Sequence, residues 1–298
     1  MTSLVEARAA TRRFGGFTAV HAVSIAVRPG EVVGLLGANG AGKTTLIRLL
    51  LGLLRPSGGG VALFGAPPAL ETRARVGYVP QTLGLYADLS VEENWRFATA
   101  AFRQGGRRLP AVMSAWGATL VGDLPLGIQR QVAFTVALAH QPELMVLDEP
   151  TSGVGPLASA RLWEQIRSEA DRGAGVLVTT HNMEEAEQCD RLEVMAEGSV
   201  VARGTATEIV GARTVAEVRC AHWQRAFSVL EKRGLGVQLH GDALRVDSPA
   251  GDVAGLLSAA GIESRVADVP ANLEDAFVAL VTREGGAGGS RPRAPGAR

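Results

Sequence analysis

A glycine-rich stretch at residues 37–45 constrains the fold of this chain more than any other feature. It reads Gly-Ala-Asn-Gly-Ala-Gly-Lys-Thr-Thr and fits the phosphate-binding pattern G-x-x-x-x-G-K-S/T. The apolar run 31–36 before it predicts a buried parallel strand, and the apolar pattern of 45–51 after it predicts a helix. The N-terminus of that helix would face any phosphate held by the loop. The alternative is a glycine-rich turn that happens to precede a lysine.

This loop supplies the candidate ligands for a nucleotide. Its glycines let backbone N–H groups curl round the phosphates, where a side chain on Cα would collide. Lys43 can reach the β- and γ-phosphates, and the Thr44 hydroxyl can ligate Mg²⁺. The predicted nucleotide contacts of the loop are Gly37, Asn39, Gly40, Ala41, Gly42, Lys43, Thr44 and Thr45.

Two carboxylates follow a second apolar run, at 144–147. A strand with acids at its carboxyl edge is what a nucleotidase with a phosphate loop needs. Asp148 would hold Mg²⁺, directly or through water, and Glu149 would polarise the attacking water as the catalytic base. A solvated acidic turn after a core strand is the alternative.

Three further residues are candidates because of their positions. Phe14 precedes two glycines and could stack on an adenine ring, or it and Phe17 could be core residues. Gln81 follows a strand-like run, and its amide could hold Mg²⁺ or the attacking water, although taken alone it is a surface glutamine. His181 ends the strand-like run 175–181 and could donate to the γ-phosphate as a second catalytic residue, or it could be a solvated strand-end histidine.

The chain is long enough for two domains. Its 298 residues are 46% apolar and 20% charged, which predicts a packed core. We expect a nucleotide-binding domain over 1–211, with a mainly helical part at about 82–140 that includes a helix over 111–120. Residues 212–283 read as βαββαβ, a small split plait without an obvious charged cluster. The tail 284–298 is rich in glycine, proline and arginine and is predicted to be disordered.

Charge and cysteine content narrow the classes of partner. Lys+Arg and Asp+Glu both number 30, which argues against nucleic-acid binding and against a polybasic membrane patch. The two cysteines, Cys189 and Cys220, have no metal-binding spacing and are expected to be reduced thiols. No run approaches 18 apolar residues, so any membrane role would come through a partner.

Residues 1–211 resemble the ATP-binding subunits of ABC transporters. The phosphate loop, Gln81, the acidic strand end and His181 occur in that family's order and spacing, and the run 148–153, Asp-Glu-Pro-Thr-Ser-Gly, is especially typical. The resemblance implies an α/β fold of the P-loop NTPase ABC type with a helical subdomain, ATP and Mg²⁺ as ligands, and Phe14 at the adenine-stacking position. The segment 272–277 is similar to the small α+β extension of drug- and antibiotic-exporter ATPases of the ABC-2 type, which is expected to be ferredoxin-like.

The sequence departs from the family's signature motif, which is usually Leu-Ser-Gly-Gly-Gln. Here it reads Leu124-Pro125-Leu126-Gly127-Ile128. In the family this segment of the opposite subunit presents a hydroxyl, backbone N–H groups and a helix N-terminus to the γ-phosphate. Pro125 lacks both hydroxyl and N–H, whereas the N–H groups of Gly127 and Ile128 remain as predicted contacts. One lost hydrogen bond to a charged group corresponds to about 1.5–3 kcal/mol.

A second departure follows the run 151–154. The family normally places an aspartate next, which helps to couple the two nucleotide sites, and here the residue is Gly155. The segment between Asn94 and Leu124 also looks short for the family's helical subdomain. Glu149 and His181 are retained, so the residues that activate water are nominally present.

Three functions are compatible with these features. The first is the ATPase subunit of an exporter, closing as a homodimer or as a heterodimer with a related subunit, at the cytoplasmic face of the membrane through separate integral membrane subunits. The second is an ATP-binding regulatory or structural partner that hydrolyses ATP poorly, marked by Pro125 and Gly155. The third is a soluble ABC-type ATPase acting on ribosomes or DNA, which the neutral charge disfavours. The sequence does not indicate the cargo.

Overall fold

The computed structural model describes residues 3–103 and 105–287, and the chain forms two compact units, 1–200 and 201–298. The division falls inside β9 (Ser199–Gly204), earlier than the boundary predicted at residue 211. The structure therefore assigns the residues between 201 and 211, including α8 (Ala206–Val210), to the second unit.

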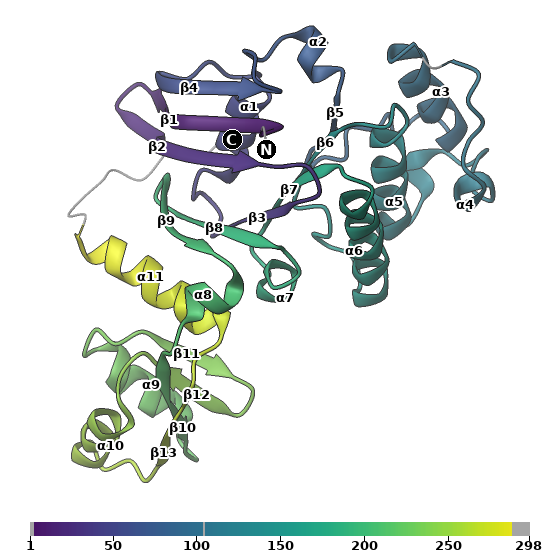
Figure 1. Ribbon diagram of the computed structural model, residues 1–298. Coiled ribbons are helices and arrows are strands. Elements are labelled where there is room, and N and C mark those ends of the chain that lie inside the picture. The colour runs from purple at the N-terminus through teal and green to yellow at the C-terminus, as the bar shows by residue number, and fades with distance from the viewer. Residues whose placement is uncertain (1–2, 104, 288–298) are drawn as a thin grey trace. The chain divides into compact units, whose positions relative to one another are not determined.

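A six-stranded sheet forms the centre of the first unit (Figure 1). Its strand order is β5–β6–β7–β3–β8–β9, and the first five strands of that order run parallel. Every residue of β3, β6 and β7 is buried, because parallel strands are covered on both faces and read as continuous apolar runs. The bounds are β3 (Val32–Gly37), β5 (Val76–Val79), β6 (Leu144–Asp148), β7 (Gly175–Thr180) and β8 (Arg191–Ala196).

A three-stranded antiparallel sheet of order β2–β1–β4 completes the β-structure of this unit (Figure 1). Its strands are β1 (Val5–Phe14), β2 (Phe17–Val27) and β4 (Gly58–Leu63). The helix α1 (Lys43–Leu50) packs between the two sheets, since its Leu46 and Ile47 share one core cluster with Val5 of β1 and Leu177 of β7. The helix that begins at the glycine-rich loop is therefore fixed by the main core.

The helical part lies beside this core and has small apolar clusters of its own, around Val91 and Trp95. Its elements are α3 (Val91–Ala101), α4 (Ala111–Ser114), the 3₁₀ turn η1 (Val121–Asp123) and α5 (Leu126–Ala137). The other helices of the unit are α2 (Leu70–Arg73), α6 (Pro156–Asp171) and α7 (Met183–Ala186).

The predicted helix over 111–120 is wrong beyond Ser114. The chain turns there, and the carbonyls of Thr119 and Gly117 accept hydrogen bonds from the first amides of α3, those of Val91 (3.1 Å) and Glu92 (3.0 Å). The N-terminal amides of a helix have no partner inside the helix, so these carbonyls satisfy the start of α3. This contact requires a turn where the apolar pattern alone predicted a helix.

The second unit is a plait with the order βαββαβ, followed by a C-terminal helix. Its sheet has the strand order β11–β12–β10–β13, and all neighbours are antiparallel. This is the split arrangement expected of a ferredoxin-like plait. The elements are β10 (Thr214–Arg219), α9 (Trp223–Glu231), β11 (Val237–His240), β12 (Ala243–Val246), α10 (Ala250–Ala259), β13 (Arg265–Pro270) and α11 (Leu273–Ala287).

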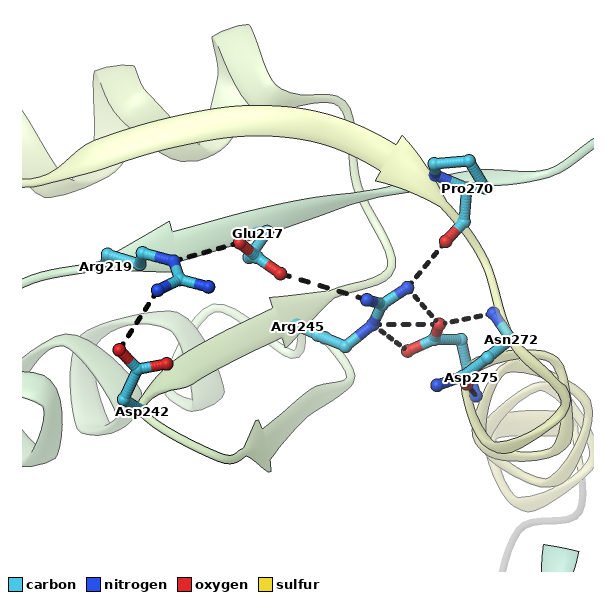
Figure 2. A network of polar contacts seen from close by, with 7 residues as sticks. All are labelled: Glu217, Arg219, Asp242, Arg245, Pro270, Asn272 and Asp275. Carbon is cyan, nitrogen blue, oxygen red and sulfur yellow. Dashed lines mark hydrogen bonds and ion pairs between the residues drawn. The ribbon is translucent and has the colours of Figure 1, made fainter. Parts of the chain in front are cut away.

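The helix α11 extends through residues 284–287, the first part of the tail that was predicted to be disordered, and 288–298 lie outside the described residues. A charged cluster that the sequence pattern did not reveal holds the start of this helix (Figure 2). Buried Arg245 of β12 donates to the Asp275 carboxylate at 2.8–3.1 Å and to the Pro270 carbonyl at 2.7 Å. Asp275 also accepts from the Asn272 amide at 2.8 Å, so the pair joins the helix N-terminus to the sheet.

We expect Asp275→Ala to destabilise the second unit by about 3 kcal/mol, because buried Arg245 then keeps only the more distant Glu217 carboxylate, at 4.0 Å. Hydrogen exchange should show faster exchange in β10, β12 and β13 and unchanged exchange in β3, β6 and β7. Asp242→Ala is the matched control, since Asp242 is an exposed partner of Arg219 in the same network and its removal should have no measurable effect. An equal loss of stability in Asp275→Ala and Asp242→Ala would contradict the conclusion that the Arg245–Asp275 pair anchors α11.

Candidate nucleotide-binding site

The parallel strands bring the predicted site residues to one edge of the sheet. β5, β6, β7 and β3 are consecutive neighbours, and the segment after each carboxyl end carries one predicted group. Those groups are Gln81 after β5, Asp148 and Glu149 at the end of β6, His181 after β7, and the phosphate loop after β3. Ligands of open α/β sheets bind at this edge.

The phosphate loop joins the end of β3 to the start of α1. Gly42 caps the helix with φ +100°, and a Cβ at that position would lie 2.4 Å from the Ala19 carbonyl oxygen. Only glycine fits there. Among the described residues, the amides of Gly40, Gly42, Lys43 and Thr44 donate no hydrogen bond, so the loop presents free N–H groups. Free amides at a helix N-terminus are a ready site for phosphate.

Lys43 is held inside the site and is only 5% exposed. Its Nζ donates to the carbonyls of Gly37 at 2.6 Å and Ala38 at 3.2 Å and lies 3.7 Å from Oε1 of Glu149. Burial lowers the pKa of Lys43, and the carboxylates of Glu149 and Asp148 act in the opposite direction. A phosphate could replace the two carbonyls as a stronger, charged acceptor.

Asp148 is 2% exposed and has one oxygen without a partner. Oδ1 accepts from the Thr179 hydroxyl at 2.6 Å, whereas Oδ2 is buried and has no hydrogen bond. A buried, unsatisfied carboxylate oxygen is unfavourable. Carboxylate oxygens are preferred ligands of Mg²⁺, so this donor set fits a magnesium ion.

Glu149 has a constrained backbone and several partners. Its φ is +50°, an unfavourable region for a residue with a side chain, and its amide donates to the Thr179 hydroxyl oxygen at 2.9 Å. Oε2 accepts from Nε2 of Gln81 at 3.3 Å, and Oε1 lies 3.4 Å from Nδ1 of His181. The carboxylate is therefore fixed beside Lys43. Sequence reasoning missed Thr179, which positions both acids, although it lies in the same run, 175–181, that pointed to His181.

Phe14 is not a core residue, because it and Phe17 are both 45% exposed. The two face each other across the β1–β2 turn, at the end of a hairpin whose Ala19 touches the phosphate loop. The guanidinium of Arg12 lies 4.6 Å from the centre of the Phe14 ring. Sequence reasoning also missed this arginine, since a cation over a ring depends on strand register.

The signature segment begins α5, with Pro125 as the residue before its first turn. The Ile128 N–H donates to the Pro125 carbonyl at 2.8 Å, so the prediction that this amide is free for an anion is not supported. Within the described part of the chain, the Gly127 N–H donates no hydrogen bond and remains available. The Leu126 side chain is exposed at the position of the family's first glycine.

Gly155 precedes α6 and has open space around it. A Cβ built there meets nothing within 4 Å, and its φ of −72° suits any residue. The missing aspartate is therefore not excluded by packing. Nearby, the buried Arg130 of α5 donates to the Ser152 carbonyl at 3.1 Å, which connects the signature helix to the segment after Glu149.

In the part of the chain that the structure describes, no helix combines the length and the apolar character needed to cross a membrane.

Comparison with known proteins agrees with this geometry. The sequence profile of the ABC transporter family matches residues 20–152. The chain is 37% identical over 219 residues to the "Probable multidrug ABC transporter ATP-binding protein YbhF" of Escherichia coli, which covers 70% of this chain and only 38% of that protein. It is 36% identical over 302 residues to the "Nod factor export ATP-binding protein I" of Cupriavidus metallidurans, which covers 95% of this chain and 99% of that protein.

A solved structure of the ATP-binding subunit of an ABC transporter has the same fold. It is similar with a TM-score of 0.65 at 31% identity, over 70% of this chain and 92% of that chain. Three observations indicate the same family: the nearly full-length match to an ATP-binding protein, the cassette fold and the phosphate loop. The chain therefore belongs to the ABC transporter family, as one of its ATP-binding cassettes.

Proposed function

We propose that this chain binds and hydrolyses Mg-ATP as the energy-supplying subunit of an exporter. The observation that carries the proposal is the position of the Glu149 carboxylate, held by Gln81 and His181 and 3.7 Å from the phosphate-loop Lys43. The names of two relatives, one a multidrug transporter protein and one an export protein, support the direction of transport.

The site residues divide between binding the nucleotide, holding the metal and activating water. The free amides of Gly40, Gly42, Lys43 and Thr44 and the ammonium of Lys43 bind the β- and γ-phosphates, whereas the Ala41 amide is engaged by the Ala38 carbonyl. Phe14 stacks on the adenine. Mg²⁺, held by Asp148, Thr44 and Gln81, would neutralise charge on the phosphates. Glu149 accepts a proton from the attacking water.

His181 is the second catalytic residue of this proposal. Its Nδ1 lies close to Glu149, and it follows a buried strand, so its ring is placed beside the carboxylate. From there it orients the base and donates a hydrogen bond to the γ-phosphate. Both roles need the end of β7 and the end of β6 to remain together.

The partners of the proposal are those of the family. Two ATP-binding chains, identical or related, would close on two ATP molecules, with Gly127 of each signature helix facing the γ-phosphate of the other chain's ATP. Separate integral membrane subunits would hold the pair at the cytoplasmic face of the membrane and would select the cargo.

A second candidate is an ATP-binding partner that hydrolyses poorly. It is favoured by the signature segment, where Pro125 has no N–H and the Ile128 N–H is engaged within its own helix. In addition, Gly155 stands where the family normally has the aspartate that helps to couple the two nucleotide sites. Measured turnover separates the two candidates.

Glu149→Gln should lower kcat for ATP by about 10²–10⁴-fold while ATP binding persists, because the amide keeps the shape of the carboxylate but accepts no proton. Turnover should be measured on the chain alone and with its co-purified membrane subunits, and binding by equilibrium dialysis. Lys43→Ala is the contrasting control, which should abolish binding itself. Unchanged turnover in Glu149→Gln would exclude Glu149 as the base.

Asp148→Asn should remove the magnesium-dependent part of ATP binding, since the orphaned Oδ2 is the proposed ligand. The measurement is the dissociation constant for ATP with Mg²⁺ and with a chelator, which should differ in the native chain and agree in the variant. Asp171→Asn, at the exposed end of α6, should behave as the native chain. A variant that still responds fully to Mg²⁺ would contradict the assignment.

Pro125→Ser should raise the turnover of the assembled dimer by roughly tenfold or more, because it restores a hydroxyl and an N–H toward the γ-phosphate. Gly155→Asp should fold normally, as the position is open, and add to the effect. Steady-state ATPase rates of both variants and their combination provide the measurement. A native chain without turnover that gains it in these variants would favour the hydrolysis-poor candidate, whereas rates that neither variant changes would contradict the effect assigned to Pro125 and Gly155.

A further inference from the structure

Glu185 is a buried carboxylate that lies outside the proposed ATP contacts. It belongs to α7, the short helix after His181, and is 7% exposed. Its Oε1 accepts a hydrogen bond from the Thr151 hydroxyl, and its Oε2 accepts one from the Thr180 hydroxyl at 2.8 Å. Within the described residues no cation forms an ion pair with it, so these two hydroxyls are what stabilise the buried group.

The two threonines belong to the two segments that carry the hydrolytic residues. Thr151 lies in the segment after Glu149, and Thr180 is the last residue of β7, directly before His181. The register of β6 and β7 ends at the pair Asp148 and Thr179. Beyond that pair the ladder of the two strands ends, and Glu185 adds a connection between the segments to the contacts of Glu149 with Thr179 and His181.

Packing does not replace this connection. A partly open cavity of about 400 Å³ borders both segments and the start of α6, and its lining includes Glu149, Thr151, Thr180, His181 and Glu185. Close-packed side chains normally hold neighbouring segments rigidly. Where a cavity takes their place, the hydrogen bonds of one carboxylate have a larger share in fixing the arrangement.

Glu185 is itself held at both ends of its helix. The side-chain oxygen of Asn182 accepts from the Glu184 amide at 2.9 Å and caps the first turn. At the other end Cys189 lies against β3, where a Cβ on Gly34 would come within 2.7 Å of its Sγ. Burial raises the pKa of Cys189 to about 12, so the thiol stays neutral and packs as an apolar group. The carboxylate is thus fixed relative to the strand that leads into the phosphate loop.

We propose that Glu185 is a positioning residue for ATP hydrolysis: it holds Glu149 and His181 in one arrangement by bonding the threonine next to each. The proposal rests on the roles proposed above for those two residues. An ionised carboxylate suits the task because its two oxygens accept from both hydroxyls at once, whereas an amide has one accepting oxygen. Glu185 acts only through Thr151 and Thr180 and does not touch the nucleotide.

Glu185→Gln is the test, in the full chain and with its membrane subunits. We expect kcat for ATP to fall by about tenfold or more, since a hydrogen bond to a charged group is lost. KM and the dissociation constant for ATP should stay within about twofold, because the phosphate loop is not touched. The exposed Glu187→Gln on the same segment is the matched control and should leave kcat unchanged. A variant with native kcat would overturn the proposal.

Hydrogen exchange gives a readout independent of turnover. The Asn182 amide donates to the Thr180 hydroxyl oxygen at 2.9 Å, and the Ser152 amide donates to the Glu149 carbonyl at 3.2 Å. Both amides should exchange faster in Glu185→Gln, while amides of α1 keep their native rates. Thr151→Val, which leaves the carboxylate in place, should loosen Ser152 in the same way. Native exchange at both amides would also overturn the proposal.

The same experiments separate this proposal from the one it rests on. If Glu149→Gln does not change kcat, the hydrolytic assignment fails, whatever Glu185→Gln does. If Glu149→Gln lowers kcat and Glu185→Gln does not, only the positioning role fails. If Glu185→Gln lowers the melting temperature but leaves kcat per bound ATP unchanged, Glu185 is a stabilising residue and not a positioning one.

Discussion

The parallel pairing of β6 with β7 and of β7 with β3 is the constraint on which the site depends. It places Asp148 opposite Thr179 and brings Lys43, from the loop after β3, to 3.7 Å from Glu149. These residues are far apart in the sequence, and only the shared sheet edge unites them. A slip of one residue would turn each side chain to the other face and would separate Asp148 from its threonine. The continuous burial of these strands makes such a slip costly.

Buried charge is the second feature that shapes the site. Asp148, Glu149 and Glu185 are all buried acids. Among the described residues, Lys43 is the buried cation that forms an ion pair with Glu149. The hydroxyls of Thr179, Thr151 and Thr180 satisfy part of this charge, but among the described residues Oδ2 of Asp148 has no partner. An excess of buried negative charge favours the binding of a cation. The chain alone therefore presents a site that a magnesium ion accompanying ATP would complete.

The sequence predicted what local patterns encode. The phosphate loop has a fixed spacing, and the buried strands are uninterrupted apolar runs, so the placement of Lys43, Asp148 and Glu149 at strand ends could be predicted. The order of elements was likewise enough for the plait of the second unit. In contrast, the early end of α4 and the engaged Ile128 N–H depend on which carbonyl lies near which amide.

Contacts between residues far apart in the sequence could not be predicted for the same reason. Arg245 and Asp275 carry no pattern that links them, yet together they fix the start of α11 (Figure 2). Thr179 and Glu185 carry no distinguishing pattern in the sequence, yet the fold joins Thr179 to Asp148 and Glu185 to Thr180. Such contacts have no period or spacing in sequence, so only the structure reveals them.

The departure at Pro125 changes the signature segment but leaves the predicted hydrolytic residues unchanged. Lys43, Asp148, Glu149 and His181, which would act on the chain's own ATP, are in place: Lys43 and His181 both contact Glu149, and Asp148 accepts a hydrogen bond from Thr179. Pro125 alters what the chain offers to the ATP of a partner. In a homodimer each ATP would then meet one intact and one altered half, so both sites would be weakened equally. In a heterodimer with a partner of regular signature, this chain's own ATP would be completed normally, and only the partner's ATP would face Pro125. The change at Pro125 would therefore weaken both sites of a homodimer but only one site of a heterodimer, because the hydrolytic residues and the signature helix of one chain serve different ATP molecules.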